Sequence, residues 1–165
     1  MAKSAKEIIS NICEEGAWYV VPAYKIMLVR DSGESVKATG KKQDVKSPQD
    51  MADIFASYLD GVDREHFVVA MLDRKGGILG LNTVSVGTIS SSVVHPREVF
   101  KPAIVIGASS IIIAHNHPSG GTMPSKEDTE VTRRLVEAGK LLGIEILDHV
   151  IIGDNYYSFK EKGMI

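Results

Sequence analysis

The sequence predicts an α/β fold, a single domain in which helices flank a mixed β-sheet. Three observations support this prediction. A chain of 165 residues corresponds to about one domain. Its apolar content of 44% at this length is sufficient for a core that needs no disulfides. Apolar segments of strand length alternate with amphipathic segments of helix length, and their order, β-β-β-α-β-α-β-β after a helical start, describes an α/β sandwich.

The N-terminal region, residues 1–60, is expected to be an extension that packs on the core formed by residues 61–165. A capping box at Ser4–Glu7 predicts a short helix, and strand-like segments lie on both sides of Pro22. The polar stretch 31–46 contains four lysines. It is interpreted as a solvated loop or hairpin, with a phosphate-binding arm as the alternative.

The middle of the chain predicts two helices and a pair of strands. A helix with one apolar face begins after Ser47, its expected N-cap, and ends at Gly61. The apolar segment 65–73 predicts a buried strand, and a tight turn then returns the chain as its partner strand. A further helix begins at His95 and contains Pro102, which would cost about 3 kcal/mol inside a helix unless the helix kinks.

The C-terminal part of the chain supplies the remaining elements. Segment 110–115 predicts a fully buried strand, and segment 125–142 predicts a long helix that stops at Gly143. Two closing strands are expected at 144–152 and 156–159. Together with the earlier strand pair, these strands complete the mixed sheet.

Composition and charge exclude several function classes. The net charge of −2 argues against a polybasic nucleic-acid binder or membrane-surface binder. The single cysteine, Cys13, excludes a disulfide-framed secreted module and a cysteine-rich zinc finger. Any metal must therefore be held mainly by histidine and carboxylate side chains. The chain lacks the apolar run of a signal peptide and any segment that could span a bilayer, so we expect a cytoplasmic protein.

Side chains that could bind a metal or take part in catalysis are concentrated in residues 115–128. His115 and His117 are two residues apart in an extended segment, so both imidazoles can point to the same side at the end of a buried strand. Ser125 caps the next helix and Asp128 lies in its first turn, so the intervening loop can fold Asp128 back towards the imidazoles. Two neutral imidazoles and one carboxylate leave a fourth position open, which is the arrangement of catalytic zinc.

Each of these residues also has a structural interpretation. A histidine is more often a surface residue or a hydrogen-bonded core residue than a metal ligand, and His-x-His at a strand end occurs by chance. Ser125 and Asp128 are both favoured at any helix N-terminus. The combination in fixed order, with a glycine- and proline-containing loop between its halves, is more specific than any of its parts.

The order His-x-His, seven residues, Ser, two residues, Asp resembles the signature of the JAMM (JAB/MPN+) metalloproteases, and His115, His117, Ser125 and Asp128 match it without a gap. Flanking segments resemble the bacterial RadC branch of that family: Gly87-Thr88-Ile89, His95-Pro96-Arg97-Glu98-Val99-Phe100 and Leu147-Asp148-His149. The resemblance covers roughly residues 61–165. It implies the cytidine deaminase-like architecture of MPN domains.

By this resemblance, His115, His117 and Asp128 would bind Zn²⁺, and a water molecule would complete the tetrahedron. Zinc lowers the pKa of such a water towards neutrality. The resemblance therefore implies hydrolytic chemistry at the pH of the cytoplasm.

The resemblance also implies roles for residues outside the ligand set. The family uses an upstream glutamate as general acid and base near the start of the first sheet strand. Glu65 occupies that place, and Glu98 is the less favoured candidate because it is expected on a helix surface. Ser125 would hydrogen-bond the oxygen of the tetrahedral intermediate. Asp148 and His149 are either second-sphere partners that orient a zinc ligand or polar groups satisfied within the sheet.

The leading hypothesis is a zinc-dependent metallopeptidase that cleaves amide or isopeptide bonds of a protein or peptide substrate. One alternative is a RadC-type DNA-repair module or metal-dependent nuclease, suggested by the family name and the lysines at 37–46 but opposed by the net charge. Residues 1–60 also lack the helix-hairpin-helix pattern of full-length RadC proteins. A second alternative, a non-catalytic MPN interaction module, is opposed by the intact ligand set. A membrane partner is not expected, and the oligomeric state is left open.

Overall fold

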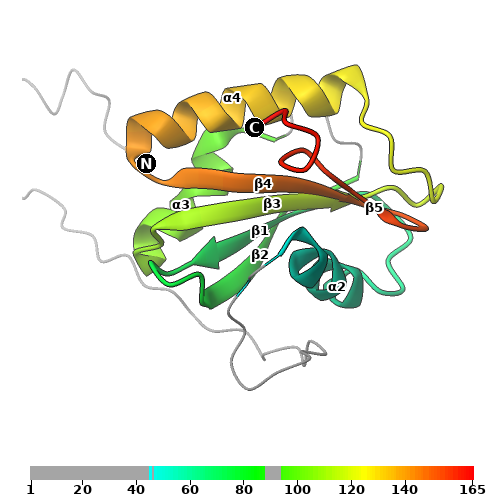
Figure 1. Cartoon of the computed structure of the whole chain (residues 1–165), viewed down its shortest axis with the longest axis horizontal. Helices are drawn as coiled ribbons and strands as arrows, with labels where there is room; N and C mark the ends of the chain where they lie inside the picture. Colours follow the sequence, from blue (N-terminus) through cyan, green and yellow to red (C-terminus); the bar gives the residue numbers. More distant parts are fainter. Residues whose placement is uncertain (1–44, 46, 88–93) are drawn as a thin grey trace, which may run out of the picture.

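The computed structural model describes residue 45, residues 47–87 and residues 94–165 (Figure 1). The elements predicted before residue 45 lie outside these described residues, as do residues 88–93 between the second strand and the helix that follows it. In chain order, the described elements are α2 (Pro48–Tyr58), β1 (His66–Leu72), β2 (Ile78–Val86), α3 (Pro96–Ile106), β3 (Ser110–Asn116), α4 (Lys126–Leu142), β4 (Glu145–Ile152) and β5 (Tyr156–Ser158).

The strands form one mixed sheet in the order β2-β1-β3-β4-β5 within the described part of the chain. β1 pairs antiparallel with both β2 and β3, and β5 pairs antiparallel with β4. β3 and β4 are parallel, and α4 is the crossover that joins them. The N-terminus of α4 therefore lies at the carboxyl end of β3. The predicted single-domain mixed sheet with flanking helices is confirmed.

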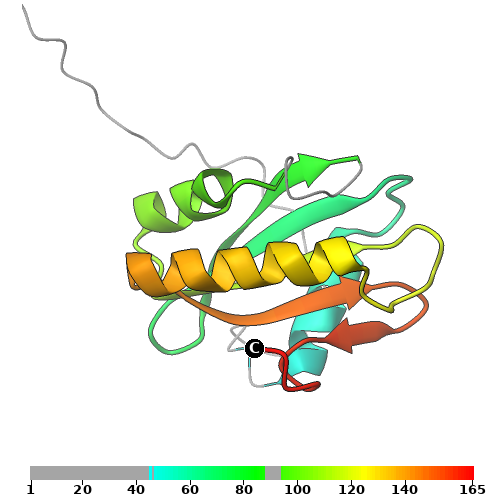
Figure 2. The ribbon, with the colours of Figure 1, turned by 90° about the horizontal axis from the view of Figure 1, so that it is seen from above.

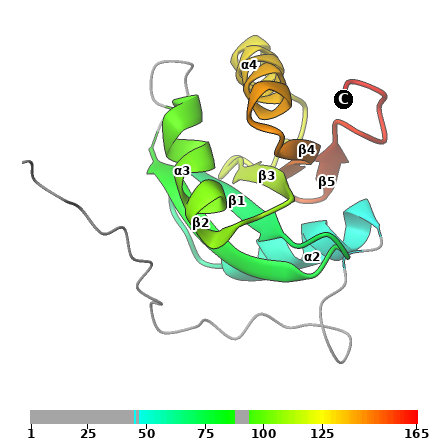
Figure 3. The same ribbon diagram turned by 90° about the vertical axis from the view of Figure 1, so that its left-hand side faces the viewer.

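Helices cover both faces of the sheet: α3 and α4 lie on one face and α2 lies on the other (Figures 2 and 3). Successive side chains of a strand point to opposite faces, so β1 and β3 contribute to two separate cores. Alternate residues pack with α3 and α4, among them Phe67, Val69, Ile111 and Ile113. The residues between them pack with α2, among them Val68, Ala70, Ile112 and Ala114.

The helix predicted from Ser47 is α2, and its N-terminus is a capping box. The Ser47 hydroxyl accepts a hydrogen bond from the Asp50 backbone N–H at 3.2 Å, and the Asp50 carboxylate accepts one from the Ser47 N–H at 2.9 Å. Met51 and Phe55 are buried against the sheet. The helix ends at Tyr58, a few residues before the predicted stop at Gly61. The domain boundary predicted at residue 60 stays a prediction, although α2 itself packs on the sheet.

The other two helices also begin where the sequence predicts. α3 starts after its N-cap His95 and runs through Pro102 to the left-handed Gly107. Pro102 has no N–H to donate to the carbonyl of Glu98, and no described contact explains how the helix accommodates it. α4 starts after its N-cap Ser125 and ends at the left-handed Gly143. None of the described helices is long and apolar enough to cross a membrane.

Replacing Phe55 with alanine tests whether α2 is an integral layer of the domain. Phe55 has no exposed surface, so the cavity left by Phe55→Ala should lower the free energy of unfolding by about 3–5 kcal/mol, measured by chemical denaturation. Leu141→Ala is the matched control, because Leu141 is 89% exposed and its truncation should change stability by less than about 0.5 kcal/mol. Equal effects of the two substitutions would contradict the packing described for α2.

Candidate metal centre

Three side chains converge where β3 ends and α4 begins. His115 Nε2 lies 3.0 Å from His117 Nε2 and 3.3 Å from Asp128 Oδ1. His117 Nε2 lies 3.8 Å from Asp128 Oδ2. One ligand atom from each residue lies within 4.8 Å of the other two, and His115 and Asp128 are buried whereas His117 is half-buried. This group could bind a metal ion on the side reached by solvent.

The spacing of these atoms suits a small divalent ion with four ligands. Bond lengths of about 2.0–2.1 Å in a tetrahedron place neighbouring donor atoms about 3.3–3.4 Å apart. The two imidazole nitrogens are 3.0 Å apart, and His115 Nε2 lies 3.3 Å from Asp128 Oδ1, both close to this value. His117 Nε2 lies 3.8 Å from the other carboxylate oxygen, Oδ2. His115 Nε2 therefore has the spacing of a tetrahedral ligand with both His117 Nε2 and Asp128 Oδ1.

The imidazole of His117 is held by its own loop. Its backbone N–H donates to the Ile152 carbonyl at 2.8 Å, which continues the parallel pairing of β3 with β4 beyond Asn116. Its Nδ1 lies 2.7 Å from the Gly121 carbonyl, so the ring is turned with Nε2 towards the other two ligands. The loop residue Gly120 donates from its N–H to the His117 carbonyl at 2.9 Å.

A close backbone contact anchors the same loop to the turn between β4 and β5. The Asp154 N–H donates to the Gly120 carbonyl at 2.9 Å. A Cβ atom on Gly153 would lie only 2.2 Å from that carbonyl oxygen and 2.9 Å from a methyl group of Thr122. Only glycine fits at position 153, so the loop that presents His117 depends on this contact.

Asp128 is fixed by the capping box of α4. Its Oδ2 accepts from both the backbone N–H and the hydroxyl of Ser125, each at 2.7 Å, and its own N–H donates to the Ser125 Oγ at 3.0 Å. A carboxylate in the first turn of a helix is also favoured by the helix dipole. These contacts leave Oδ1 as the atom nearest to His115.

Behind His115 lies a buried chain of polar groups. His115 Nδ1 lies 2.8 Å from His149 Nε2, and His149 Nδ1 lies 2.6 Å from Thr132 Oγ1. The Thr132 hydroxyl also lies 2.6 Å from the carbonyl oxygen of Asp128, to which it donates. The ring of Phe159 stacks on His149 with a centroid distance of 4.8 Å, and His149 has no exposed surface. His149 thus contacts a predicted ligand, as its proposed orienting role requires.

Burial controls the charge of His115 and His149, the two histidines of this buried hydrogen-bonded series. Desolvation lowers the pKa of His115 to about 4, with the Asp128 carboxylate opposing the shift. Desolvation also holds the pKa of His149 well below its usual range, and the neighbouring His115 adds to this effect. Both rings are therefore neutral near pH 7, the state in which imidazole binds a metal.

Thr132 belongs to none of the motifs that are visible in the sequence. It lies four residues after Asp128 on α4, so the helical period places both on one face of the helix, and this spacing is the signal that could have found it. Its partner His149 lies on β4, and the pairing of helix with strand depends on packing that the spacing alone does not give.

Asp148 forms its hydrogen bonds with groups other than the three candidate metal ligands. Its Oδ2 accepts from the Ser158 hydroxyl at 2.6 Å, and its Oδ1 accepts from the backbone N–H groups of His149 at 2.7 Å and Lys160 at 2.9 Å. Burial raises the pKa of Asp148, and the Ser158 hydrogen bond opposes that rise. Asp148 anchors the C-terminal turn that carries Phe159, and its role as an orienting partner of a ligand stays a prediction.

Glu65 precedes β1 at the same end of the sheet. Phe67 and His115 are the last pair of the antiparallel register between β1 and β3, and Glu65 lies two residues before this pair. Phe67 stacks on His115, so the strand that follows Glu65 contacts a candidate ligand two residues further on. The Gly87 N–H donates to the Glu65 carbonyl at 2.8 Å and holds its backbone.

Asn116, which lies between the two histidines, fixes the backbone on both sides of Glu65. Its Oδ1 accepts from the His66 N–H at 2.7 Å, and its Nδ2 donates to the Arg64 carbonyl at 2.9 Å. The side chain that points away from the ligands therefore positions the segment expected to supply the general base.

Glu98, the less favoured glutamate, lies on the outer side of α3. Its carboxylate pairs with Lys101 and with Arg97, and all three side chains are substantially exposed. The hydrogen bond from Lys101 lowers the pKa of Glu98. These contacts are those of a solvated helix surface and favour Glu65 for the catalytic role.

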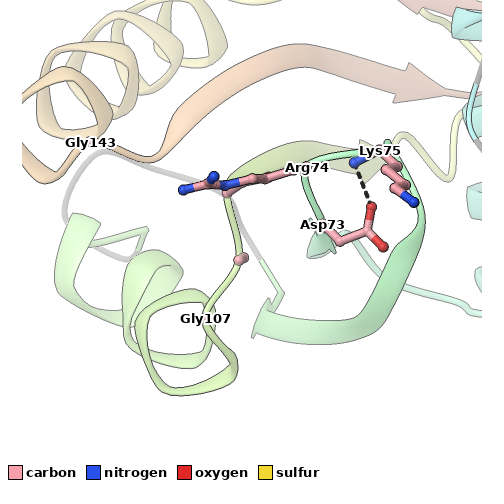
Figure 4. Close-up of a pocket in the computed structure, with 7 residues that line it drawn as sticks. Asp73, Arg74, Lys75, Gly107 and Gly143 are labelled. Carbon is pink, nitrogen blue, oxygen red and sulfur yellow. Dashed lines mark hydrogen bonds between the residues drawn. The ribbon is translucent and has the colours of Figure 1, made fainter.

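A surface hollow lies at the opposite end of the sheet, where β1 and α4 end and β3 begins (Figure 4). Its lining consists of Asp73, Arg74, Lys75, Gly107, Ala108, Ser109 and Gly143. The Asp73 carboxylate accepts hydrogen bonds from the N–H groups of Lys75 and Gly77 within its own turn. The hollow contains none of the predicted site residues.

A family model and similar proteins from several bacteria place this chain in the same family. The RadC-like JAB domain family matches residues 45–164. A bacterial protein named UPF0758 from Rubrobacter xylanophilus is 49% identical over 87% of this chain and 60% of its own length. Similar proteins from Syntrophomonas wolfei and Caldanaerobacter subterraneus are 54% and 45% identical, over 73% and 99% of this chain. The chain spans 54–70% of the length of these relatives. The matches confirm the resemblance noted in the sequence.

Alanine at position 153 should disturb the loop that presents His117. Because the new Cβ would clash with the Gly120 carbonyl, we expect Gly153→Ala to lower the free energy of unfolding by about 1–3 kcal/mol, the usual effect of overpacking. It should also weaken Zn²⁺ binding, measured by competition with a chelating dye.

Gly121→Ala is the matched control in the same loop. Its Cβ would meet nothing closer than 4.0 Å, and the carbonyl that contacts His117 is retained. If both variants bind Zn²⁺ like the unchanged protein, the Gly120–Gly153 contact does not support the site.

The stability of the metal-free protein should fall as the pH is lowered from about 6.5 to about 5. His115 and His149 stay neutral in the folded state but bind protons in the unfolded state, so acid favours unfolding. Two such groups give a slope of up to about 2.7 kcal/mol per pH unit in this window. Asp148, with its raised pKa, acts in the opposite sense at lower pH. Urea denaturation at a series of pH values measures the slope.

His149→Phe serves as the comparison, because it removes one of the two groups and should reduce the slope by about half. A stability that does not change across this window would show that the buried histidines are not held neutral.

Proposed function

Because the chain belongs to the RadC-like JAB domain family, we propose that it is a zinc-dependent hydrolase that cleaves peptide or isopeptide bonds. The observation that carries the proposal is the convergence of His115, His117 and Asp128 at the solvent-facing end of β3. Two imidazole nitrogens and one carboxylate are a donor set that suits zinc and leaves a fourth position for water or substrate.

Zinc bound there would lower the pKa of a water molecule and polarise a substrate carbonyl. The chain's own groups must then move protons and orient the reactants. Glu65 is the proposed general base: a carboxylate oxygen takes a proton from the attacking water and later delivers it to the nitrogen of the leaving amine. Its place just before the Phe67–His115 pair, with a backbone fixed by Asn116 on both sides, supports this role.

Ser125 is proposed to stabilise the oxyanion that forms on the substrate carbonyl. Its hydroxyl has one proton, which in the resting arrangement goes to Asp128 Oδ2. The Ser125 backbone N–H donates to the same oxygen at the same distance of 2.7 Å. The hydroxyl can therefore turn towards substrate while the backbone N–H keeps Asp128 in place, so the capping and catalytic roles are compatible.

A protein or peptide is the proposed substrate, and the cytoplasm is the proposed compartment. Amide hydrolysis requires a base, an oxyanion donor and an electrophilic metal, and this end of the sheet offers residues for all three roles. The net charge of −2 does not favour a nucleic-acid partner. A chain with one cysteine suits a reducing compartment.

Glu65→Gln separates metal binding from catalysis. We expect this variant to retain one equivalent of zinc by elemental analysis, because Glu65 is not a ligand. Cleavage of peptide and isopeptide libraries should fall by about 10²–10⁴-fold, the usual contribution of a general base. Asp128→Asn should lose both zinc and cleavage. Glu98→Gln is the control and should behave like the unchanged protein, since its carboxylate pairs with Lys101 and Arg97.

The proposal fails if the unchanged protein carries stoichiometric zinc but cleaves no member of either library. Salt-dependent DNA binding in the absence of peptide cleavage would instead favour the nucleic-acid alternative. An unchanged rate for Glu65→Gln would remove Glu65 from the mechanism.

A further inference from the structure

We propose that Thr132 and His149 are positioning residues that fix the protonation pattern of His115, so that its Nε2 faces the metal site as an unprotonated ligand. This inference rests on the metal site of the proposed function. The two side chains would keep the proton of a buried candidate ligand on the nitrogen that faces away from the metal.

The carbonyl of Asp128 sets the direction of the hydrogen bonds that link Thr132, His149 and His115. A carbonyl oxygen can only accept, so the single proton of the Thr132 hydroxyl must point to the Asp128 oxygen 2.6 Å away. The hydroxyl oxygen then has only lone pairs for its other neighbour, His149 Nδ1, also at 2.6 Å. His149 Nδ1 therefore carries a proton and donates it to Thr132.

The neutral ring of His149 determines which of the facing nitrogens of His149 and His115 is the donor. It has no exposed surface, and both of its nitrogens have uncharged partners. Because its single proton is on Nδ1, its Nε2 is an acceptor. The group 2.8 Å away, His115 Nδ1, must then be the donor. With its proton on Nδ1, neutral His115 presents a bare Nε2 to Asp128 and His117.

His117 reaches the same state through a separate contact. Its Nδ1 lies 2.7 Å from the Gly121 carbonyl and must donate to it, so in the neutral ring the unprotonated nitrogen is Nε2. The two bare Nε2 atoms are 3.0 Å apart, with a carboxylate oxygen 3.3 Å from one of them. Three acceptors at these distances repel one another unless a cation lies between them, so the protonation pattern is one that favours metal binding.

Asp128 thus has two functions from one position. Its carboxylate is a proposed ligand, and its backbone carbonyl is the fixed end of the chain that directs the proton of His115. Thr132 lies one helical turn further along α4, so the same helix supplies both. Phe67 and Phe159 pack against His149, which keeps out water that could donate to its nitrogens and reverse the direction.

Removing the Thr132 hydroxyl should release this control. In Thr132→Val, His149 Nδ1 has no acceptor, so the neutral ring gains by moving its proton to Nε2 and donating to His115 Nδ1. The proton of His115 must then move to its own Nε2. Metal binding has to displace that proton, and the affinity for zinc falls.

The test uses ¹⁵N NMR of the histidine rings in the metal-free protein, together with zinc affinity by competition with a chelating dye. In the unchanged protein, His115 and His149 should both carry the proton on Nδ1. Thr132→Val should move His149, wholly or in part, to the Nε2-protonated form. It should also weaken zinc binding by about 10–100-fold, the usual effect of removing an outer-sphere partner.

Two further variants separate this role from a general effect on α4. Thr132→Ser retains the hydroxyl and should restore both the ring protonation and the affinity. Thr129→Val removes the same kind of hydroxyl-to-carbonyl hydrogen bond on the same helix, from Thr129 to Ser125, with no histidine behind it. It should leave both measurements unchanged.

The inference is overturned if His115 is protonated on Nε2 in the unchanged protein, or if Thr132→Val leaves the ring protonation and zinc affinity as they were. Equal losses in Thr129→Val and Thr132→Val would likewise overturn it. These outcomes are distinct from failure of the proposed function, because the NMR measurement needs neither metal nor substrate. A protein with the expected protonation pattern but no peptide cleavage would retain this inference and lose the proposed hydrolase activity.

Discussion

The arrangement of this site depends on one topological constraint, the crossover of α4 between the parallel strands β3 and β4. A crossover helix must start beside the end of the strand that precedes it, so Asp128 in the first turn of α4 comes to lie near His115 at the end of β3. The same crossover packs α4 over β4, which brings Thr132 to His149. The meeting of the candidate ligands and of their supporting contacts therefore follows from a single connection.

Burial of polar groups next to the ligands is the second constraint. A buried imidazole with an unsatisfied nitrogen would be destabilising, and in the described part of the protein every fully buried side-chain nitrogen and oxygen has a hydrogen-bond partner. Satisfying His149 needs an acceptor on one side and a donor on the other, and Thr132 and His115 supply these. The requirement for complete hydrogen bonding thus also determines which nitrogen of His115 faces the metal site.

Much of this arrangement could be predicted from the sequence, because it depends on local periodicity. The strand at 110–115, the N-cap Ser125 and the two-residue spacing of His115 and His117 are visible in a single stretch of chain. The contacts of Thr132 and Asp148 could not be predicted in this way. They depend on how α4 and the C-terminal turn pack against β4, and the residues that meet are 17 and 10 positions apart in the sequence. That the segment carrying Glu65 lies beside the end of β3 similarly follows from the register of β1 against β3.

We expect one divalent ion to bind between His115, His117 and Asp128 through the Nε2 atoms of both histidines. Anomalous diffraction at the zinc absorption edge, from crystals grown with zinc, tests it most directly. The expected result is one strong peak within about 2.0–2.2 Å of His115 Nε2, His117 Nε2 and an Asp128 carboxylate oxygen. A peak at another place, coordination through Nδ1 of either histidine, or no peak at this group would contradict it.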